Sequence, residues 1–255
     1  MGEGWIMSKI LLIIPAYNEE NHIGSVLDRA LSLKELYSSL DLLVIDDGSE
    51  DCTAEIARAK GVDVVRHDEN GGEEAAIQTG FDYALKHNYD FVVKLDGDGQ
   101  HIPSEVTKIL DPLCKNEADV VVGSRLSGYS ELLLFKLGRT FCSIMVSLLL
   151  RKKIADPTSG LKGRNHLAVK YSRMLYTTTK SLHNDMVNDI EELLWYSKKK
   201  MRIKEVVVKM NRREEASKCY CSTRMLKFPF VLFITILRSL LTVTPQRSYK
   251  RHESP

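Results

Sequence analysis

The sequence has little excess of either charge, few cysteines and no long uninterrupted apolar run. Its 36 basic and 34 acidic residues leave a net charge of +2 over 255 residues. This balance argues against a dedicated nucleic-acid binder, because such proteins usually carry a strong basic excess. The five cysteines form no Cys-x-x-Cys pair, which favours free thiols in a reducing compartment over a disulfide framework or a zinc site.

Two apolar segments fall short of the ~20 uninterrupted apolar residues that span a bilayer comfortably. Residues 132–153 carry interspersed lysine and arginine, and residues 228–243 are interrupted by Arg238. Three alternatives stay open: amphipathic helices that pack on the domain or on a partner chain, helices that lie in the membrane interface, and a second segment that spans the membrane. The N-terminus lacks a basic region followed by an apolar one, so we expect no signal peptide.

Short apolar runs alternate with helical patterns along the first half of the chain. Each run is rich in valine and isoleucine and ends in glycine, aspartate, asparagine or proline, which is typical of strands buried on both faces of a sheet. The expected strands are residues 9–17, 41–49, 62–67, 90–96 and 118–125, and the expected helices are 19–33, 53–60, 73–87 and 103–115. This order predicts an α/β fold with a doubly wound, mostly parallel sheet flanked by helices.

Polar residues follow four of the expected strands at the point where each strand ends. They are Tyr17-Asn18-Glu19, Asp46-Asp47-Gly48-Ser49, Asp96-Gly97-Asp98 and Gly123-Ser124-Arg125. Because ligands bind at the carboxyl ends of the strands in such sheets, we expect a binding site along this edge.

Asp96 and Asp98 place two carboxylates on either side of Gly97. Carboxylates this close repel unless a cation lies near them. Mg²⁺ typically accepts one or two carboxylates together with substrate phosphates, which suits this arrangement. The alternative is an Asp-Gly turn with solvated aspartates.

Seven segments stand out in order along the chain. They are IIPAYNEEN (13–21), VIDDGSEDCTAEIA (44–57), Asn70-x-Gly72, KLDGDGQHIP (94–103), VVVGSR (120–125), ADPTSGLKGRN (155–165) and RIKEVVVKMNRR (202–213). Through these segments the chain resembles the family-2 inverting glycosyltransferases, in particular the polyprenyl and dolichyl phosphate sugar transferases and their bacterial relatives. The resemblance covers roughly residues 8 to 218.

The resemblance implies a GT-A fold, a UDP- or GDP-linked diphospho-sugar donor and a Mg²⁺ or Mn²⁺ ion held by Asp96 and Asp98. It implies that the donor is bound by Pro15, Ala16, Tyr17 and Glu19 beside the nucleotide, by Asp46 and Asp47 at the base and ribose, by Asn70 and Gly72, by Asp96 at the diphosphate, and by Arg125 and Arg213 at phosphate. It places Gln100, Asp156, Ser159 and Gly160 on the acceptor side.

The acceptor decides whether the reaction needs a base. A polyprenyl phosphate oxygen is already anionic, whereas a hydroxyl must lose its proton to a carboxylate. Residues 183–197 offer Asp185, Asp189 and Glu192 on one helical face, with Glu191 beside them. Acids at this place face the acceptor in many relatives, so the resemblance favours Asp189 as a catalytic residue. The alternative is a solvated acidic face.

Three features depart from the family pattern. Glu73-Glu74 stands where relatives often carry a basic residue and then glycine, so this loop faces away from the donor or the donor lies differently. The loop after Arg213 has lost a glycine, with Arg212 as an alternative match. The C-terminal spanning helices of some relatives are reduced to one interrupted apolar stretch, which favours surface attachment.

The leading hypothesis is a hexosyltransferase that is cytoplasmic and peripheral at the inner face of the cytoplasmic membrane. Its acceptor would be a polyprenyl phosphate or another lipid-linked or glycan precursor. The alternatives are a hydroxyl-acceptor transferase of surface polysaccharide assembly and a degenerate, non-catalytic binder of nucleotide sugars. We expect a catalytic domain at residues 8–218, an apolar helix and polar tail at 219–255, possible homo-oligomers and no nucleic-acid partner.

Overall fold

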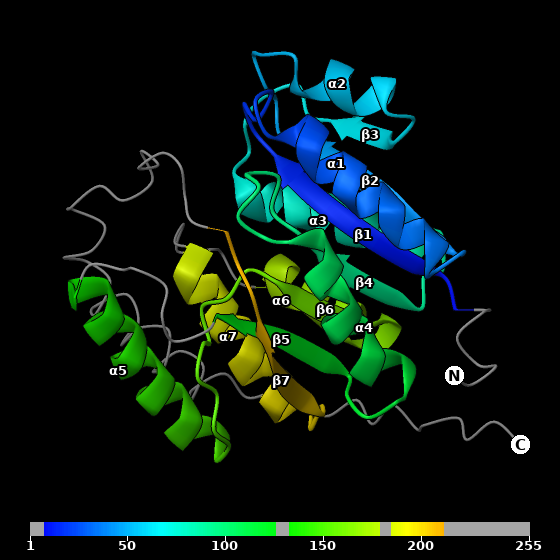
Figure 1. The fold of residues 1–255 in the computed structure, drawn as a ribbon. Helices are drawn as coiled ribbons and strands as arrows, with labels where there is room; N and C mark the ends of the chain where they lie inside the picture. The colour runs from blue at the N-terminus through cyan, green and yellow to red at the C-terminus, as the bar shows by residue number, and fades with distance from the viewer. Residues whose placement is uncertain (1–7, 126–132, 179–184, 212–255) are drawn as a thin grey trace, which may run out of the picture.

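A seven-stranded sheet forms the centre of the molecule (Figure 1). The computed structural model describes residues 8–125, 133–178 and 185–211. In these residues the strand order is β3-β2-β1-β4-β6-β5-β7. The strands are β1 (Ile10–Ala16), β2 (Leu40–Asp46), β3 (Asp63–Arg66), β4 (Phe91–Lys94), β5 (Val120–Arg125), β6 (Lys162–Asn165) and β7 (Ile203–Val208).

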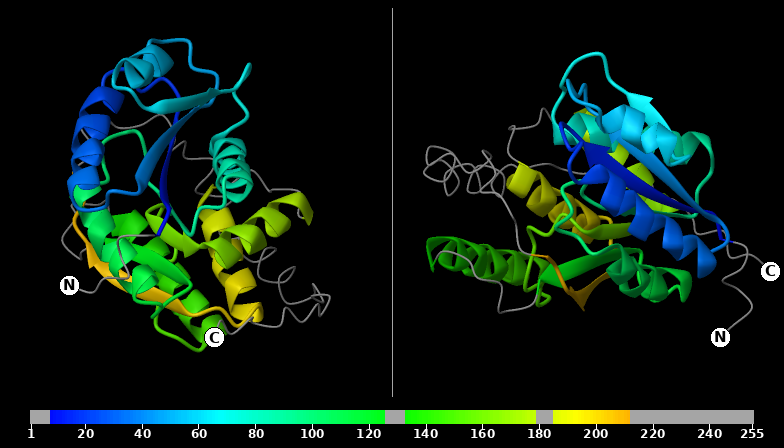
Figure 2. Two further views of the ribbon diagram at one scale, coloured as in Figure 1. Left: turned by 90° about the vertical axis from the view of Figure 1, so that its right-hand side faces the viewer. Right: turned by 45° about the horizontal axis from the view of Figure 1, so that its top comes forward.

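Helices cover both faces of the sheet (Figure 2). They are α1 (Ile23–Leu31), α2 (Thr53–Ala59), α3 (Glu73–Lys86), α4 (Val106–Cys114), α5 (Leu133–Leu150), α6 (His166–Thr178) and α7 (Asp185–Lys198), with short 3-10 turns η2 (Ser32–Glu35) and η3 (Pro103–Glu105). Alternate residues of β1 enter different cores: Leu12 packs in the core of α1 and α4, and Ile13 in the core of α3. This two-sided burial explains why the strands read as continuous apolar runs.

The expected strands and helices of the first half are confirmed to within a few residues. Three elements that follow were not predicted: strand β6, helix α6 and strand β7. Strand β6 pairs antiparallel with both β4 and β5, and helix α6 follows it directly. The sequence of β6, Lys-Gly-Arg-Asn, has no apolar character, so it carries none of the signal that marks a buried strand.

Helix α5 lies within the apolar segment 132–153. Cys142 and Val146 pack against Ile190 and Leu194 of α7, while Phe141, Ile144 and Leu148 form an exposed apolar stripe. One face of the helix therefore packs on the domain and another faces outward. In the described part of the chain, no helix is long and apolar enough to cross a membrane. The second apolar segment and the predicted tail lie outside the described residues.

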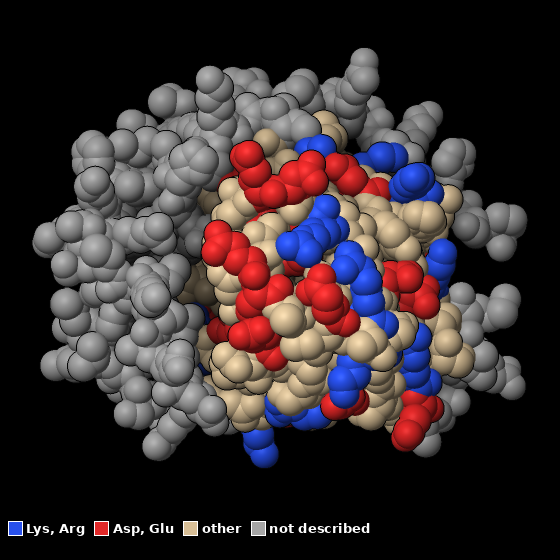
Figure 3. Space-filling view, turned by 90° about the horizontal axis from the view of Figure 1, so that it is seen from above, with Lys and Arg blue, Asp and Glu red and all other residues tan. Residues whose placement is uncertain are grey.

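Paired charges lie at the edge strand β3 and on the neighbouring helix α2. Arg66 of β3 and Arg58 of α2 both lie near the Glu55 carboxylate. Seen from above, acidic and basic side chains are interspersed over the visible face (Figure 3).

The thiols of Cys52, Cys114 and Cys142 are free.

Candidate active site

Asp96 and Asp98 lie directly after β4, beside the end of β1. A Cβ atom at Gly97 would lie 3.2 Å from the carbonyl oxygen of Pro15 and 3.3 Å from the Cβ of Ala16. Such contacts are tighter than ordinary packing, so glycine lets the loop approach β1 closely. The close approach joins two predicted parts of the site, the end of β1 and the paired aspartates.

Asp96 is held by charged and polar neighbours. Its Oδ1 lies 3.0 Å from the Lys94 ammonium, and its backbone N–H donates to His101 Nδ1 at 3.2 Å. Burial would raise the pKa of Asp96, but Lys94 and then His101 outweigh burial and lower the pKa to about 2. Burial lowers the pKa of His101. Asp96 is therefore ionised at neutral pH.

Asp98 is organised by Gln100, which the resemblance assigned to the acceptor side. The backbone N–H of Gln100 donates to Asp98 Oδ1 at 3.0 Å, and the side-chain amide donates to Oδ2. Asn211, just beyond β7, binds this loop through the carbonyl oxygens of Gln100 at 2.8 Å and Gly99 at 2.9 Å. Gln100 thus fixes the Asp98 carboxylate, and the chain after β7 supports the loop.

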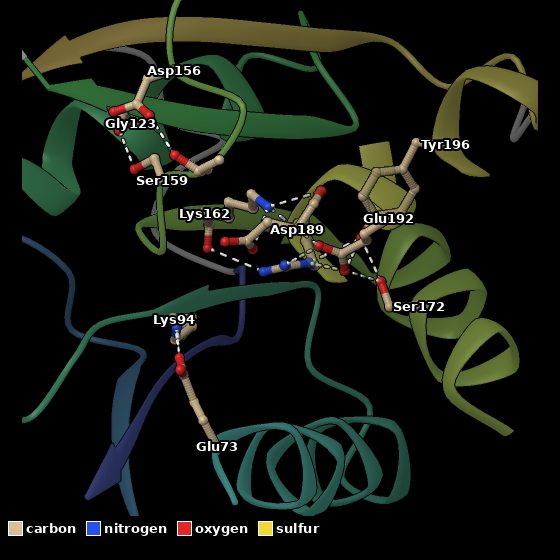
Figure 4. Close-up of polar contacts among 12 residues, drawn as sticks. Glu73, Lys94, Gly123, Asp156, Ser159, Lys162, Ser172, Asp189, Glu192 and Tyr196 are labelled. Atoms are coloured by element: carbon tan, nitrogen blue, oxygen red, sulfur yellow. Dashed lines mark hydrogen bonds and ion pairs between the residues drawn. The ribbon is translucent and has the colours of Figure 1, made fainter. Parts of the chain in front are cut away.

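Glu73 and Glu74, which depart from the family pattern, both make contacts inside the molecule. Glu73 Oε1 contacts the ammonium of Lys94, as Figure 4 shows. Glu74 accepts a hydrogen bond from Asn188 of α7 at 3.0 Å. The Lys94 pKa is raised well above its ordinary value because Asp96 and then Glu73 outweigh burial, which alone would lower it.

Asp46 and Asp47, at the end of β2, organise neighbouring loops. Asp47 Oδ1 accepts from Gly71 N–H at 3.0 Å, and its Oδ2 accepts from Gly72 N–H at 2.7 Å. Its Oδ1 also lies 2.7 Å from His67 Nδ1. Asp46 Oδ1 accepts from Ser49 N–H at 3.1 Å. The contacts made by Asp47 fix the glycine loop that leads into α3.

The end of β1 contacts the loop after β2. The backbone N–H of Asn18 donates to the Ser49 hydroxyl at 2.9 Å, and the N–H of Glu19 donates to the Thr53 hydroxyl at 2.8 Å. Tyr17 beside them is 43% exposed. Asn70 accepts from the N–H of Gly72 at 3.1 Å. The predicted donor residues of β1 and β2 therefore lie in adjoining loops at one edge of the sheet.

Arg125 and Asp156 are partners of each other, although the resemblance assigned them to different substrates. Arg125 donates to both Asp156 oxygens, at 2.6 and 2.8 Å. The Ser159 hydroxyl donates to the carbonyl oxygen of Gly123. A Cβ atom at Gly160 would lie 3.0 Å from Asp96 Oδ2. The segment around Gly160 therefore lies against Asp96.

Asp189 contacts a buried charged cluster that connects β6, α6 and α7 (Figure 4). Lys162 donates to Asp189 Oδ1 at 2.6 Å, and Arg164 binds both oxygens of Glu192 at 2.9 and 2.6 Å. Burial raises the pKa of Asp189, although Lys162 and then Lys94 oppose it. A raised pKa suits a carboxylate that takes up a proton near neutral pH. The rest of this cluster comprises Ser172 and Tyr196.

Sequence reasoning missed several residues of the site. Lys94, Lys162, Arg164 and His67 were not singled out, although each contacts an acid that was. The two cations of β6 stand at alternate positions and so share one face of the strand; this spacing was the available signal. Arg213 lies outside the described residues, and so does the side chain of Asp185.

The acidic residues of this edge fit a divalent cation that shares its ligands with a substrate. In the described part of the chain, no group of three or more histidine, cysteine, aspartate or glutamate side chains could hold a metal by itself. Mg²⁺ commonly takes one or two carboxylates and fills its other positions with water and substrate phosphates. Asp96 and Asp98 provide such a pair.

Comparison with known proteins gives a consistent relationship over most of the chain. The profile of "Glycosyl transferase family 2" matches residues 11–181. An uncharacterized protein of Methanocaldococcus jannaschii is 32% identical over 206 residues, covering 79% of this chain and 81% of the relative. The UDP-N-acetylglucosamine–dolichyl-phosphate N-acetylglucosaminyltransferase of Methanococcus voltae is 29% identical over 222 residues, covering 78% of this chain and 84% of the relative.

The fold matches solved structures of glucosyl-3-phosphoglycerate synthase from Mycobacterium tuberculosis. One of them is in complex with Mn²⁺, uridine diphosphate and phosphoglyceric acid, and it superposes with a TM-score of 0.70 at 19% sequence identity. The superposition covers 94% of this chain and 81% of the solved chain. A likeness at this identity establishes the GT-A fold that the sequence predicted.

Proposed function

Since the chain belongs to glycosyl transferase family 2, we propose that it is an inverting hexosyltransferase that uses a nucleotide diphospho-sugar and a polyprenyl phosphate. The observation that carries the proposal is the position of Asp96 and Asp98 after β4, with Gly160 packed against Asp96. A relative that covers most of the chain is named for a UDP-linked donor and a dolichyl phosphate acceptor. A hydroxyl acceptor of surface polysaccharide assembly is the second candidate.

We assign the donor to the loops that follow β1, β2 and β4. Tyr17, Glu19 and Asp46 would border the nucleotide, and Asp96 and Asp98 would hold Mg²⁺ or Mn²⁺ at the diphosphate. A bound cation would stabilise the negative charge that grows on the leaving nucleoside diphosphate. Arg125 lies beside this edge with its guanidinium oriented by Asp156, where it would face phosphate. We also propose that Arg213 contacts phosphate.

The acceptor would approach beside Gly160 and attack the anomeric carbon from the face opposite the diphosphate. An anionic phosphate oxygen needs no strong base for this attack. Lys94 and Lys162, both buried near Asp189, leave that carboxylate in a positive environment. With a hydroxyl acceptor, Asp189 would take the proton.

We place the enzyme at the inner face of the cytoplasmic membrane, as a peripheral protein. The stripe formed by Phe141, Ile144 and Leu148 on α5 is exposed, and Arg151, Lys152 and Lys153 follow at the end of this helix. An apolar face with basic residues at its margin suits an interface with anionic headgroups. We also propose that the catalytic domain ends at residue 218 and that the protein can form homo-oligomers.

The donor is identified by a thermal-shift titration. We expect one nucleotide sugar from a panel of UDP-, GDP- and dTDP-sugars to raise the melting temperature in the presence of Mn²⁺, because a ligand that binds only the folded state stabilises it. The shift should shrink when Mn²⁺ is omitted or chelated. If no donor shifts the melting temperature with or without Mn²⁺, the assigned donor site is wrong.

Asp189→Asn tests which acceptor class is used. With a polyprenyl phosphate acceptor, we expect kcat to fall by less than about tenfold, because no proton must be removed from the nucleophile. With a hydroxyl acceptor, the loss would be about 10² to 10⁴-fold. In that case wild-type activity would also fall at low pH as Asp189 is protonated, at a higher pH than for an ordinary aspartate because burial raises its pKa. The measurement is the pH dependence of kcat for both proteins.

A further inference from the structure

The buried ammonium of Lys94 lies between two carboxylates that belong to different parts of the chain. The side chain of Lys94 is 7% exposed, and it ends β4 two residues before Asp96. It contacts Glu73 Oε1 and lies 3.0 Å from Asp96 Oδ1. Figure 4 shows Glu73 reaching from the first turn of α3 toward Lys94. An ammonium so far from water needs such partners.

Charge balance gives Glu73 a function that its position in the sequence does not suggest. Glu73 and Lys94 together are neutral, so Asp96 keeps its negative charge toward the loop that holds Asp98. If Glu73 were neutral, Asp96 would be the main counter-charge of Lys94. The attraction between Asp96 and a bound cation would then weaken. A basic residue at position 73 would put two like charges next to each other.

The contact between Glu73 and Lys94 also fixes the backbone of the glycine loop that leads into α3. Glu73 follows Gly72, whose φ of +87° is a conformation that favours glycine, and the N–H of Gly72 donates to Asp47. The loop is thus attached to β2 through Asp47 and to β4 through Glu73. A displacement of α3 away from β4 would therefore separate Glu73 from Lys94.

We propose that Glu73 and Lys94 form a positioning ion pair that keeps Asp96 oriented and leaves its negative charge available to a divalent cation and its nucleoside diphosphate. This inference rests on the proposed function, because it assumes that Asp96 and Asp98 bind the cation. The pair explains how the chain tolerates a carboxylate at position 73: Lys94 neutralises it.

The test is Mn²⁺ affinity, measured by titration calorimetry on the full chain in the presence of UDP or GDP. We expect Glu73→Gln to weaken Mn²⁺ binding about tenfold, because Lys94 then neutralises Asp96. Glu74→Gln is the matched control, since Glu74 has the same charge in the same helical turn but contacts Asn188. Its Mn²⁺ affinity should stay within about threefold of wild type.

The double variant Glu73→Gln/Lys94→Met separates charge balance from a merely structural contact. It removes both charges of the pair, so we expect Mn²⁺ affinity within about threefold of wild type, although the contact is lost. Lys94→Met alone should bind Mn²⁺ at least as tightly as wild type. Circular dichroism melting checks that each variant folds.

Three results would overturn the inference while leaving the proposed function intact: wild-type affinity in Glu73→Gln, equal weakening in Glu73→Gln and Glu74→Gln, or a double variant as weak as Glu73→Gln. If the wild-type protein binds no Mn²⁺ with either nucleotide, the proposed function itself is wrong and the inference falls with it. Measuring the wild type first therefore distinguishes the two failures.

Discussion

Asp98→Ala is expected to lower the transfer rate by roughly a thousandfold or more. The carboxylate is one of two that we assign to the cation, and stabilisation of developing charge is commonly the largest contribution to such a reaction. Gln100 orients this side chain through its backbone N–H and its amide, so the charge is already in place before the substrate binds. Alanine removes the charge without adding bulk.

The measurement is the release of nucleoside diphosphate with the donor identified by thermal shift, at saturating Mn²⁺. Asp28→Ala is the control, because Asp28 is an exposed aspartate that pairs with Lys60 on the surface. We expect its activity within about twofold of wild type, since exposed pairs contribute little. If Asp98→Ala keeps more than a tenth of the wild-type rate, the assignment of Asp98 to the cation is wrong.

Arg164→Met is expected to lower the free energy of unfolding by about 3–5 kcal/mol. Glu192 is fully buried, and its two carboxylate oxygens accept hydrogen bonds from Nε and Nη2 of Arg164. Removing the guanidinium leaves a buried carboxylate whose remaining ion-pair partner among the described residues is Lys162, 3.8 Å away. Urea denaturation measures the change. Adding Glu192→Leu to Arg164→Met should recover part of the loss, because no unpaired charge then remains in the core.

The same pair makes the fold sensitive to acid. Burial would raise the pKa of Glu192, but Arg164 and then Lys162 lower it from an ordinary value of 4.5 to about 2. Because the folded-state pKa is the lower one, its contribution to stability is fully present above about pH 5 and is lost as the pH falls from 4.5 through 2.

Glu192→Gln should therefore flatten the dependence of stability on pH between about 5 and 2. Glu117→Gln is the matched control, because Glu117 pairs with Lys204 at the surface; its stability should change by less than about 1 kcal/mol. An unchanged acid dependence in Glu192→Gln would contradict the assigned role of the buried pair.

The proposed chemistry places acids and cations in alternation across the middle of the sheet. Glu73, Lys94 and Asp96 meet at the end of β4, and Lys162 of β6 pairs with Asp189 beside them. A site of this kind holds its groups by mutual charge before any substrate arrives. Such preorganisation is what makes electrostatic stabilisation effective.

In the first half of the chain, the order of strands and helices could be read from the sequence because apolar residues recur with the periods of buried strands and amphipathic helices. The site edge followed from it, since parallel strands end on the same side of a sheet. The sequence by itself therefore places Asp46, Asp96 and Asp98 at one edge. The fold agrees, because Asp46 ends β2, the two other aspartates follow β4, and both strands flank β1.

The tertiary structure alone decided which charged residues are partners. Arg125 and Asp156 were assigned to different substrates, yet they bind each other across 31 residues of chain. Arg164 and Glu192 meet across 28 residues through β6, a strand without apolar character. A buried charge is stable only when another element supplies its counter-charge. Sequence periodicity records which residues face the core, but the pairing of charges depends on how distant elements pack together.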